Sequence, residues 1–198
     1  MGLQDETLNF YEENAESFTS GTISADMKDA RSRFLERLPF PARILDFGCG
    51  SGRDTKAFLD AGYTVDAVDG SPKLCRAASE YTGICVKQML FQELEEENAY
   101  DGIWACASIL HLPKEELAPV LKKIAAALRP EGILYTSFKY GTFEGMRGGR
   151  YFTYFTEETL TGFWREIPEL KEPEIWITQD VRPGRDGERW INILAGRE

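Results

Sequence analysis

The stretch that decides the fold is Arg43-Ile44-Leu45-Asp46-Phe47-Gly48-Cys49-Gly50-Ser51-Gly52-Arg53-Asp54. An apolar run ends in glycines at every second position, and a helical pattern follows. This order predicts a strand, a tight turn and a helix N-terminus, which together open a nucleotide-binding βα unit. Glycine lets the backbone turn sharply and lets a ligand lie against it. The free amides at the start of the helix suit an anionic group.

A second signal lies about 20 residues after these glycines. Residues 64–69 predict the next strand, and this strand ends in Asp69. A carboxylate at that place can accept hydrogen bonds from both ribose hydroxyls of an adenosine. Two signals at this spacing favour a nucleoside site over a glycine turn without a ligand.

The glycine pattern distinguishes between nucleoside cofactors. A dinucleotide fingerprint needs a glycine at position 53, where the chain has Arg53, so pyrophosphate binding is disfavoured. The stretch instead resembles the first motif of the class I S-adenosylmethionine (SAM) methyltransferases, and Asp69-Gly70-Ser71-Pro72 resembles their second. Residues 100–111 resemble the family's fourth strand with its following loop, and residues 128–134 resemble its turn into a fifth strand. The resemblance covers about residues 43 to 140.

The resemblance implies an α/β fold with a Rossmann-like, doubly wound, mostly parallel seven-stranded sheet closed by an antiparallel hairpin. Residues 175–178 and 190–194, joined by a turn-rich segment, predict this hairpin. We expect one domain over 1–198, with an N-terminal helical lid (1–40), a cofactor-binding core (43–140), and a substrate loop with the closing hairpin (141–198).

The remaining elements are predicted from apolar periodicity and from capping residues. Helices are expected at 3–20, 27–38, 54–61, 72 onwards, 114–128 and 156–167, and strands at 84–87, 102–107 and 133–138. Residues 145–150, rich in glycine and arginine, are predicted to form a long loop with a functional role.

Composition limits the partners and the compartment. The net charge of −10 argues against a nucleic-acid substrate, because phosphate contacts need a basic surface. No apolar run approaches membrane-spanning length, and the first residues lack the pattern of a signal peptide. The four cysteines have no metal-ligand spacing, so we expect reduced thiols and no metal site. We therefore predict a cytoplasmic protein, a monomer or homodimer, with a small-molecule substrate and no membrane partner.

The resemblance also implies how SAM is held. The glycines let the backbone lie along its methionine part, Asp46 faces the ammonium group or braces the turn, Arg53 is a candidate for the carboxylate, and Asp69 takes the ribose. The residues expected to bind SAM are Tyr11, Asp46, Gly48, Cys49, Gly50, Gly52, Arg53, Asp69, Gly70, Leu90, Phe91 and Cys106.

Four of these residues have a structural alternative. Relatives often carry an acid where this chain has Leu90, so adenine contact is expected from apolar groups and amides around Leu90 and Phe91, which could equally be core residues. Cys106 lines the methionine side or is a small core residue. Tyr11 belongs either to a lid over the cofactor or to a helix face that packs on the sheet.

The methyl acceptor is expected near the loops that follow the fourth and fifth strands. The only histidine, His111, could be a general base, a hydrogen-bond donor to the substrate, or a capping residue. Residues 137–141 with Tyr151-Phe152 and the closing hairpin look like bacterial enzymes related to tellurite-resistance methyltransferases. This narrower resemblance implies a small acceptor, such as the oxyanion tellurite, near His111, Tyr140, Arg147 or Arg150, with Arg182 and Arg185 as further candidates.

The sequence thus predicts a SAM-dependent methyltransferase acting on a small molecule by in-line methyl transfer, in which orientation of the reactants dominates. Two alternatives stay open. One is methylation of tRNA or protein, which uses the same fold core. The other is a SAM-binding regulatory protein without turnover.

Overall fold

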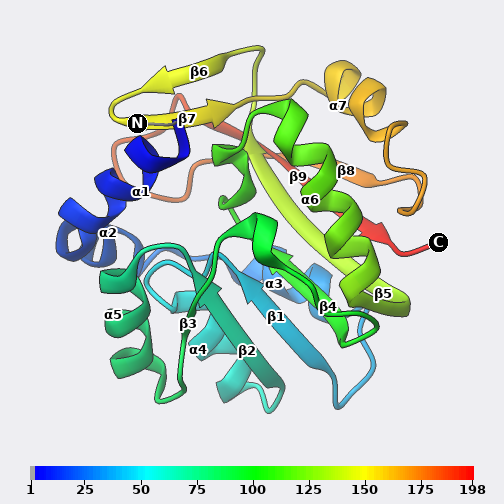
Figure 1. Ribbon diagram of the computed structural model, residues 1–198, viewed down its shortest axis with the longest axis horizontal. Coiled ribbons are helices and arrows are strands. Elements are labelled where there is room, and N and C mark those ends of the chain that lie inside the picture. Colours follow the sequence, from blue (N-terminus) through cyan, green and yellow to red (C-terminus); the bar gives the residue numbers. More distant parts are fainter. Residues whose placement is uncertain (1–2) are drawn as a thin grey trace.

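Seven strands form one sheet in the order β3-β2-β1-β4-β5-β9-β8 (Figure 1). The computed structural model describes residues 3–198. The strands of this sheet are β1 (Arg43–Phe47), β2 (Thr64–Asp69), β3 (Lys87–Gln88), β4 (Tyr100–Ala105), β5 (Leu128–Lys139), β8 (Glu174–Gln179) and β9 (Arg189–Gly196). The first five are parallel, and β9 and β8 close the sheet as an antiparallel pair. The predicted fold class is confirmed.

Helices cover both faces of the sheet, with α6 in front and α3 and α4 behind in Figure 1. The helices are α1 (Leu3–Glu13), α2 (Ala15–Thr22), α3 (Lys28–Leu35), α4 (Arg53–Asp60), α5 (Pro72–Thr82), α6 (Lys114–Ala127) and α7 (Glu157–Trp164), with 3-10 turns η1 (Phe91–Glu93) and η2 (Ile109–His111).

The central strand β4 shows why both faces are apolar. Successive side chains of a strand point to opposite faces. Trp104 therefore packs with Phe34 of α3 and Phe58 of α4, while Ile103 belongs to the cluster that contains Leu121 of α6. Because all of these side chains are fully buried, β1 and β4 are held rigidly beneath the loops at their carboxyl ends.

The helices next to the site begin at residues suited to helix N-termini. Gly52 takes φ +77° at the N-cap of α4, a conformation in which a side chain would be strained. The Ser71 side chain accepts a hydrogen bond from the amide of Leu74, and Pro72 occupies the first turn of α5. Thr156 caps α7 in the same way, by accepting a hydrogen bond from the amide of Thr159.

The structure corrects several predicted boundaries. The helix expected at 3–20 is interrupted at Asn14. The strand expected at 84–87 is replaced by the shorter β3, which consists of Lys87–Gln88. Strand β4 begins at Tyr100 and ends at Ala105, and Ala107 beyond it has a positive φ of 50°.

The predicted loop at 145–150 is wrong, because this segment is a β-hairpin. Its strands are β6 (Glu144–Arg147) and β7 (Arg150–Thr153). Gly148 and Gly149 have φ of 57° and 76°, as a two-residue hairpin turn requires. Among residues 3–198, no helix combines the length and the apolar character needed to cross a membrane.

Candidate active site

The site lies where the strand order of the sheet reverses. From β1 the chain runs outward through β2 and β3, and β4 then returns to the other side of β1, so the loops after β1 and β4 diverge and leave a crevice. A larger cavity of about 520 Å³ opens there, and a smaller cavity of about 80 Å³ adjoins it. Both cavities are lined by Tyr11, Phe18, Gly48, Gly50, Ala107 and His111.

Asp69 stands at the smaller cavity, at the carboxyl end of β2. Its carboxylate accepts hydrogen bonds from the amides of Gly50 and Ser71, each at 2.9 Å. Burial raises the pKa of Asp69, although these amide bonds act in the opposite direction. A carboxylate offers about four acceptor sites, so both oxygens keep acceptor capacity for a ligand.

Apart from Asp69 and a few other polar groups, the walls of the smaller cavity are apolar. Leu90 and Phe91 are half-buried and line it, with Gly70 beside them. The Phe91 ring packs edge-on against Phe47, with the ring centroids 4.9 Å apart. Leu8 of α1 covers Gly70 so closely that a Cβ there would lie 2.6 Å from it. A flat, largely apolar group fits between these side chains.

Asp46 lies at the glycine-loop end of the larger cavity. It is buried and accepts a hydrogen bond of 2.5 Å from the Thr55 hydroxyl. Burial, together with the nearby negative charge of Asp54, raises the pKa of Asp46 to about 7. Cys49 lines the same cavity.

Arg53 enters the cavity wall from the first turn of α4, held by Asp54. The Asp54 carboxylate receives Arg53 at 2.5 Å, Arg31 of α3 at 2.6 Å and the Trp104 indole nitrogen at 3.0 Å. Burial alone would raise the pKa of Asp54, but the two guanidinium groups hold it below its usual value. Because Arg31 and Arg53 share the single carboxylate of Asp54, these three groups together carry a net positive charge. The Cys106 sulfur lies beside them, 3.8 Å from the Arg53 guanidinium.

The opposite wall comes from η2, the hairpin β6–β7 and helix α1. The Tyr11 hydroxyl lies 2.7 Å from Nε2 of His111, and Nδ1 of His111 lies 2.6 Å from the carbonyl oxygen of Tyr151. Burial lowers the pKa of His111 to about 4, and the cations Arg150 and Lys139 act in the same direction. His111 is therefore neutral at pH 7.

Arg150 is a cation without a carboxylate partner among residues 3–198. Its guanidinium packs over Phe10 at 4.4 Å and over Phe152 at 5.1 Å from the ring centroids, and its buried Nε has no hydrogen-bond partner. The other basic residues of the cavity are paired: Arg53 with Asp54, Arg182 with Asp180, and Lys139 and Arg185 with Glu188. Arg150 is thus the group with the strongest unmet demand for an anion.

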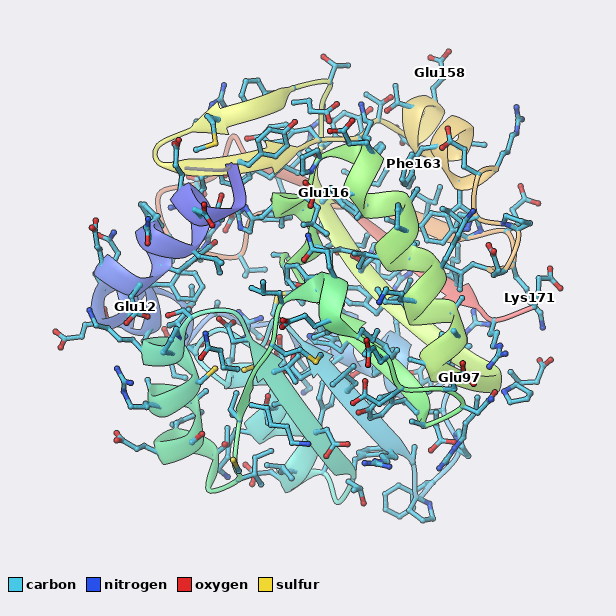
Figure 2. All side chains as sticks on the ribbon, in the orientation of Figure 1. Glu12, Glu97, Glu116, Glu158, Phe163 and Lys171 are labelled. Carbon is cyan, nitrogen blue, oxygen red and sulfur yellow. The ribbon has the colours of Figure 1, made fainter. Side chains whose placement is uncertain are left out.

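Helix α1 lies over both cavities and is fixed at its C-terminal end and near its middle. Glu12 accepts hydrogen bonds from the Ser71 hydroxyl at 2.7 Å and from the Lys73 amide at 3.0 Å, and Figure 2 shows Glu12 above the start of α5. Near the middle of the helix, Thr7 accepts a hydrogen bond of 2.9 Å from the Tyr151 amide of β7. The helix thereby connects α5 to the hairpin across the crevice.

Three of the expected site residues do not line either cavity. Gly52 faces α5, where a Cβ would lie 2.9 Å from the Thr82 side chain. The Tyr140 hydroxyl donates to Glu157 at 2.9 Å. Arg147 packs over the ring of Phe143, at 4.6 Å. Conversely, Arg31 and Asp54 were missed, because nothing in the sequence marks an ion pair between α3 and α4.

Comparison with known proteins finds similarity to methyltransferases. Residues 44–132 match the family described as "Methyltransferase domain". The chain is 36% identical over 100 residues to N-terminal Xaa-Pro-Lys N-methyltransferase 1 of Xenopus tropicalis, covering 46% of this chain and 44% of the relative. It is 30% identical over 124 residues to YqeM of Bacillus subtilis, covering 56% and 50%. The chain thus spans about half the length of these curated relatives.

A solved structure covers more of the chain. The 1,6-didemethyltoxoflavin-N1-methyltransferase of Burkholderia thailandensis, with bound 1,6-didemethyltoxoflavin and S-adenosylhomocysteine, is 25% identical. The similarity covers 96% of this chain and 84% of that one, with a TM-score of 0.73. The chain thus has the fold of a SAM-dependent methyltransferase structure over nearly its whole length, and residues 44–132 match a methyltransferase domain. The narrower tellurite-resistance branch is not established by these comparisons.

The residues of this methyltransferase domain fit its cofactor. Asp69 has acceptor capacity for ribose hydroxyls, the smaller cavity is apolar, and Asp46 and Arg53 offer opposite charges suited to an ammonium and a carboxylate. Gly50, at φ +55°, has no side chain, and a Cβ there would lie 3.0 Å from the Phe18 ring. At Gly50, the backbone next to the cavity therefore carries no side chain.

SAM binding to the methyltransferase domain should depend on pH. The ammonium group favours the ionised form of Asp46, whose pKa in the free protein is about 7. As the pH falls below 7, binding must displace a proton, and affinity should drop about tenfold per pH unit. Calorimetry between pH 5.5 and 8 measures this slope.

The matched control for this slope is Asp46→Asn. This variant keeps the shape of the side chain but cannot ionise, so it should bind more weakly at pH 8 and show no slope below pH 7. A slope that persists in Asp46→Asn would assign the dependence to another group.

Proposed function

We propose that this protein transfers the methyl group of SAM to a small, negatively charged acceptor. The observation that supports this best is Arg150, a cation with no ion pair to any of residues 3–198, on the wall of a cavity of about 520 Å³ that the glycine loop also lines. Cavities of about 300–1,000 Å³ are typical of small-molecule sites. Arg182 and Lys139 also line the cavity, but each is already paired with a carboxylate, which leaves Arg150 as the cation available to an anion.

The proposed roles of the cofactor residues follow from their positions. Asp69 holds the ribose, and Leu90, Phe91 and Gly70 enclose the adenine. Asp46 holds the ammonium group and Arg53 the carboxylate, while the backbone from Gly48 to Gly50, with Cys49 and Cys106, borders the methionine part. When bound, SAM supplies an electrophilic methyl group on a positively charged sulfur.

The chain contributes positioning and exclusion of water. Holding the acceptor in line with the donor removes much of the entropic barrier of a bimolecular reaction. Helix α1 and the hairpin β6–β7 act as the lid that keeps water from the crevice, as the contacts of Thr7 and Glu12 support. An acceptor that arrives as an anion is already nucleophilic, so the neutral His111 need not remove a proton.

Two kinds of relative bear on the class of acceptor. The Burkholderia protein is named for a small molecule, and the Xenopus protein is named for a protein N-terminus. The acidic chain and the covered cavity favour the small molecule here, and an oxyanion such as tellurite is one anion that Arg150 could bind. A tRNA or protein acceptor, or SAM binding without turnover, would appear as distinct outcomes of the following assay.

The test is incubation with methyl-labelled SAM and a panel of acceptors. The panel contains tellurite, selenite and small aromatic and aliphatic carboxylates, with peptides and tRNA in parallel. We expect label transfer to an anionic small molecule, and thermal stabilisation by SAM but not by NAD, because Arg53 replaces the third glycine of a dinucleotide site. Transfer only to peptides or tRNA, or stabilisation by NAD equal to that by SAM, would contradict the proposal.

A further inference from the structure

The Tyr11 hydroxyl belongs to the lid helix but lies where the two cavities meet. The ring lines both cavities and packs edge-on against Phe18 and His111, with centroids 5.0 and 5.4 Å away. If the smaller cavity takes the adenosine and the larger one the methionine, the junction is where the sulfur and its methyl group belong. Tyr11 is therefore the lid residue best placed to touch the reacting group.

The directions of the hydrogen bonds around His111 can be assigned. A carbonyl oxygen only accepts, so the bond of 2.6 Å to Tyr151 requires the proton on Nδ1 of His111. Because His111 is neutral, Nε2 carries a lone pair, and the Tyr11 hydroxyl must donate to it across 2.7 Å. Burial raises the pKa of Tyr11 even though Arg150 lies beside it, so the phenol keeps its proton.

This arrangement fixes what Tyr11 can do towards a ligand. Its single proton is engaged by His111, so the hydroxyl cannot donate to a ligand. The Arg150 guanidinium also donates to the Tyr11 oxygen, and the remaining lone pair of that oxygen can accept a hydrogen bond in the cavity. The hydrogens of a methyl group on a cationic sulfur are polarised, and C–H···O contacts with such groups are weakly favourable.

We propose that Tyr11 contacts the sulfonium-bound methyl group of SAM as a hydrogen-bond acceptor, and that His111 is the positioning residue that orients its hydroxyl. This inference rests on the proposed function. The inference gives His111 no role in catalytic proton transfer. The Nε2 atom of His111 already accepts from Tyr11, and the nearby cations Arg150 and Lys139 oppose protonation of the ring.

The first test reads the tautomer directly. His111 is the only histidine of the chain, so nitrogen NMR of histidine-labelled protein needs no further assignment. We expect the Nδ1–H tautomer, neutral from pH 8 down to about 5, in the protein without ligand. An Nε2–H tautomer would overturn the proposal, whether or not the protein is active.

The second test separates the methyl group from the rest of the cofactor. SAM and S-adenosylhomocysteine differ by the methyl group and the charge on sulfur, and Tyr11→Phe keeps the aromatic ring. We expect Tyr11→Phe to weaken SAM binding about fivefold, the size of a modest hydrogen bond, with less than a twofold effect on S-adenosylhomocysteine. Tyr81→Phe, at an exposed position, is the matched control and should change neither.

Variants of His111 distinguish positioning from packing. His111→Asn can still donate to the Tyr151 carbonyl but loses the acceptor for Tyr11, so it should reproduce the SAM-selective loss of Tyr11→Phe. His111→Gln, whose side-chain carbonyl can accept a hydrogen bond from Tyr11, should restore part of the lost SAM affinity. Equal weakening of both ligands in Tyr11→Phe would show a merely structural role and overturn the inference. If the wild-type protein bound neither ligand, the proposed function itself would fall, and the inference with it.

Discussion

Arg150→Met should lower kcat/KM for the anionic acceptor by about 100-fold, since losing one partner of a buried charge pair typically costs 2–5 kcal/mol. Methionine keeps an apolar stem against Phe10 and removes only the charge and its donors. The dissociation constant of SAM should change far less, because Arg150 reaches SAM only through its hydrogen bond to Tyr11. Steady-state kinetics with the acceptor found by the labelling assay, and calorimetry with SAM, measure the two effects.

Arg147→Met is the control from the same hairpin. Arg147 pairs with Arg150 across β6 and β7 but packs over Phe143, outside both cavities. It should therefore leave kcat/KM within about twofold of the wild type, as expected for an exposed charge. Comparable losses in both variants would mean that the hairpin acts through general electrostatics and that Arg150 has no direct contact with the acceptor.

Asp69→Ala should weaken SAM binding by about 1.5–3 kcal/mol, or roughly 10- to 150-fold, the usual contribution of hydrogen bonds to a charged group. The variant loses the ribose contact, and it also releases the Gly50 amide that Asp69 holds at 2.9 Å. The fold should persist, because burial raises the pKa of Asp69 and its ionised form is therefore not a source of stability.

The control for Asp69→Ala lies on the same strand. Asp66 of β2 forms a surface ion pair with Arg43 at 2.7 Å, so Asp66→Ala should leave SAM affinity unchanged. Calorimetry gives the affinities, and thermal unfolding shows whether each variant folds. If Asp69→Ala bound SAM with the same dissociation constant as the wild type, the role of Asp69 would be limited to bracing the glycine loop.

The cofactor side of the site was predictable because it is encoded locally. Asp46 and Asp69 each end a parallel strand, and such ends meet at one edge of a sheet whatever the rest of the chain does. The glycines of residues 48–52 specify the turn between strand and helix through backbone geometry that few other residues adopt. Apart from Gly52, the residues that the family resemblance assigned to SAM line the two cavities of this crevice.

The acceptor side was predicted less well. Tyr140, Arg147 and Arg150 were expected together, but only Arg150 lines the cavity. The difference arises from the packing of α1 against β7. Gly149 allows Phe10 to approach so closely that a Cβ would lie 3.1 Å from its ring, and Phe10 in turn receives the Arg150 guanidinium.

The sequence by itself determined the sheet, the glycine turn and the two carboxylates, because short-range periodicity and strand-end chemistry act between neighbouring residues. Only the tertiary structure decided which groups complete the site. The Thr7–Tyr151 and Tyr11–His111 bonds join residues 144 and 100 positions apart, and Asp54 gathers Arg31 from a separate helix. Such contacts depend on burial and on the relative placement of α1, α3 and the hairpin, which no local pattern specifies.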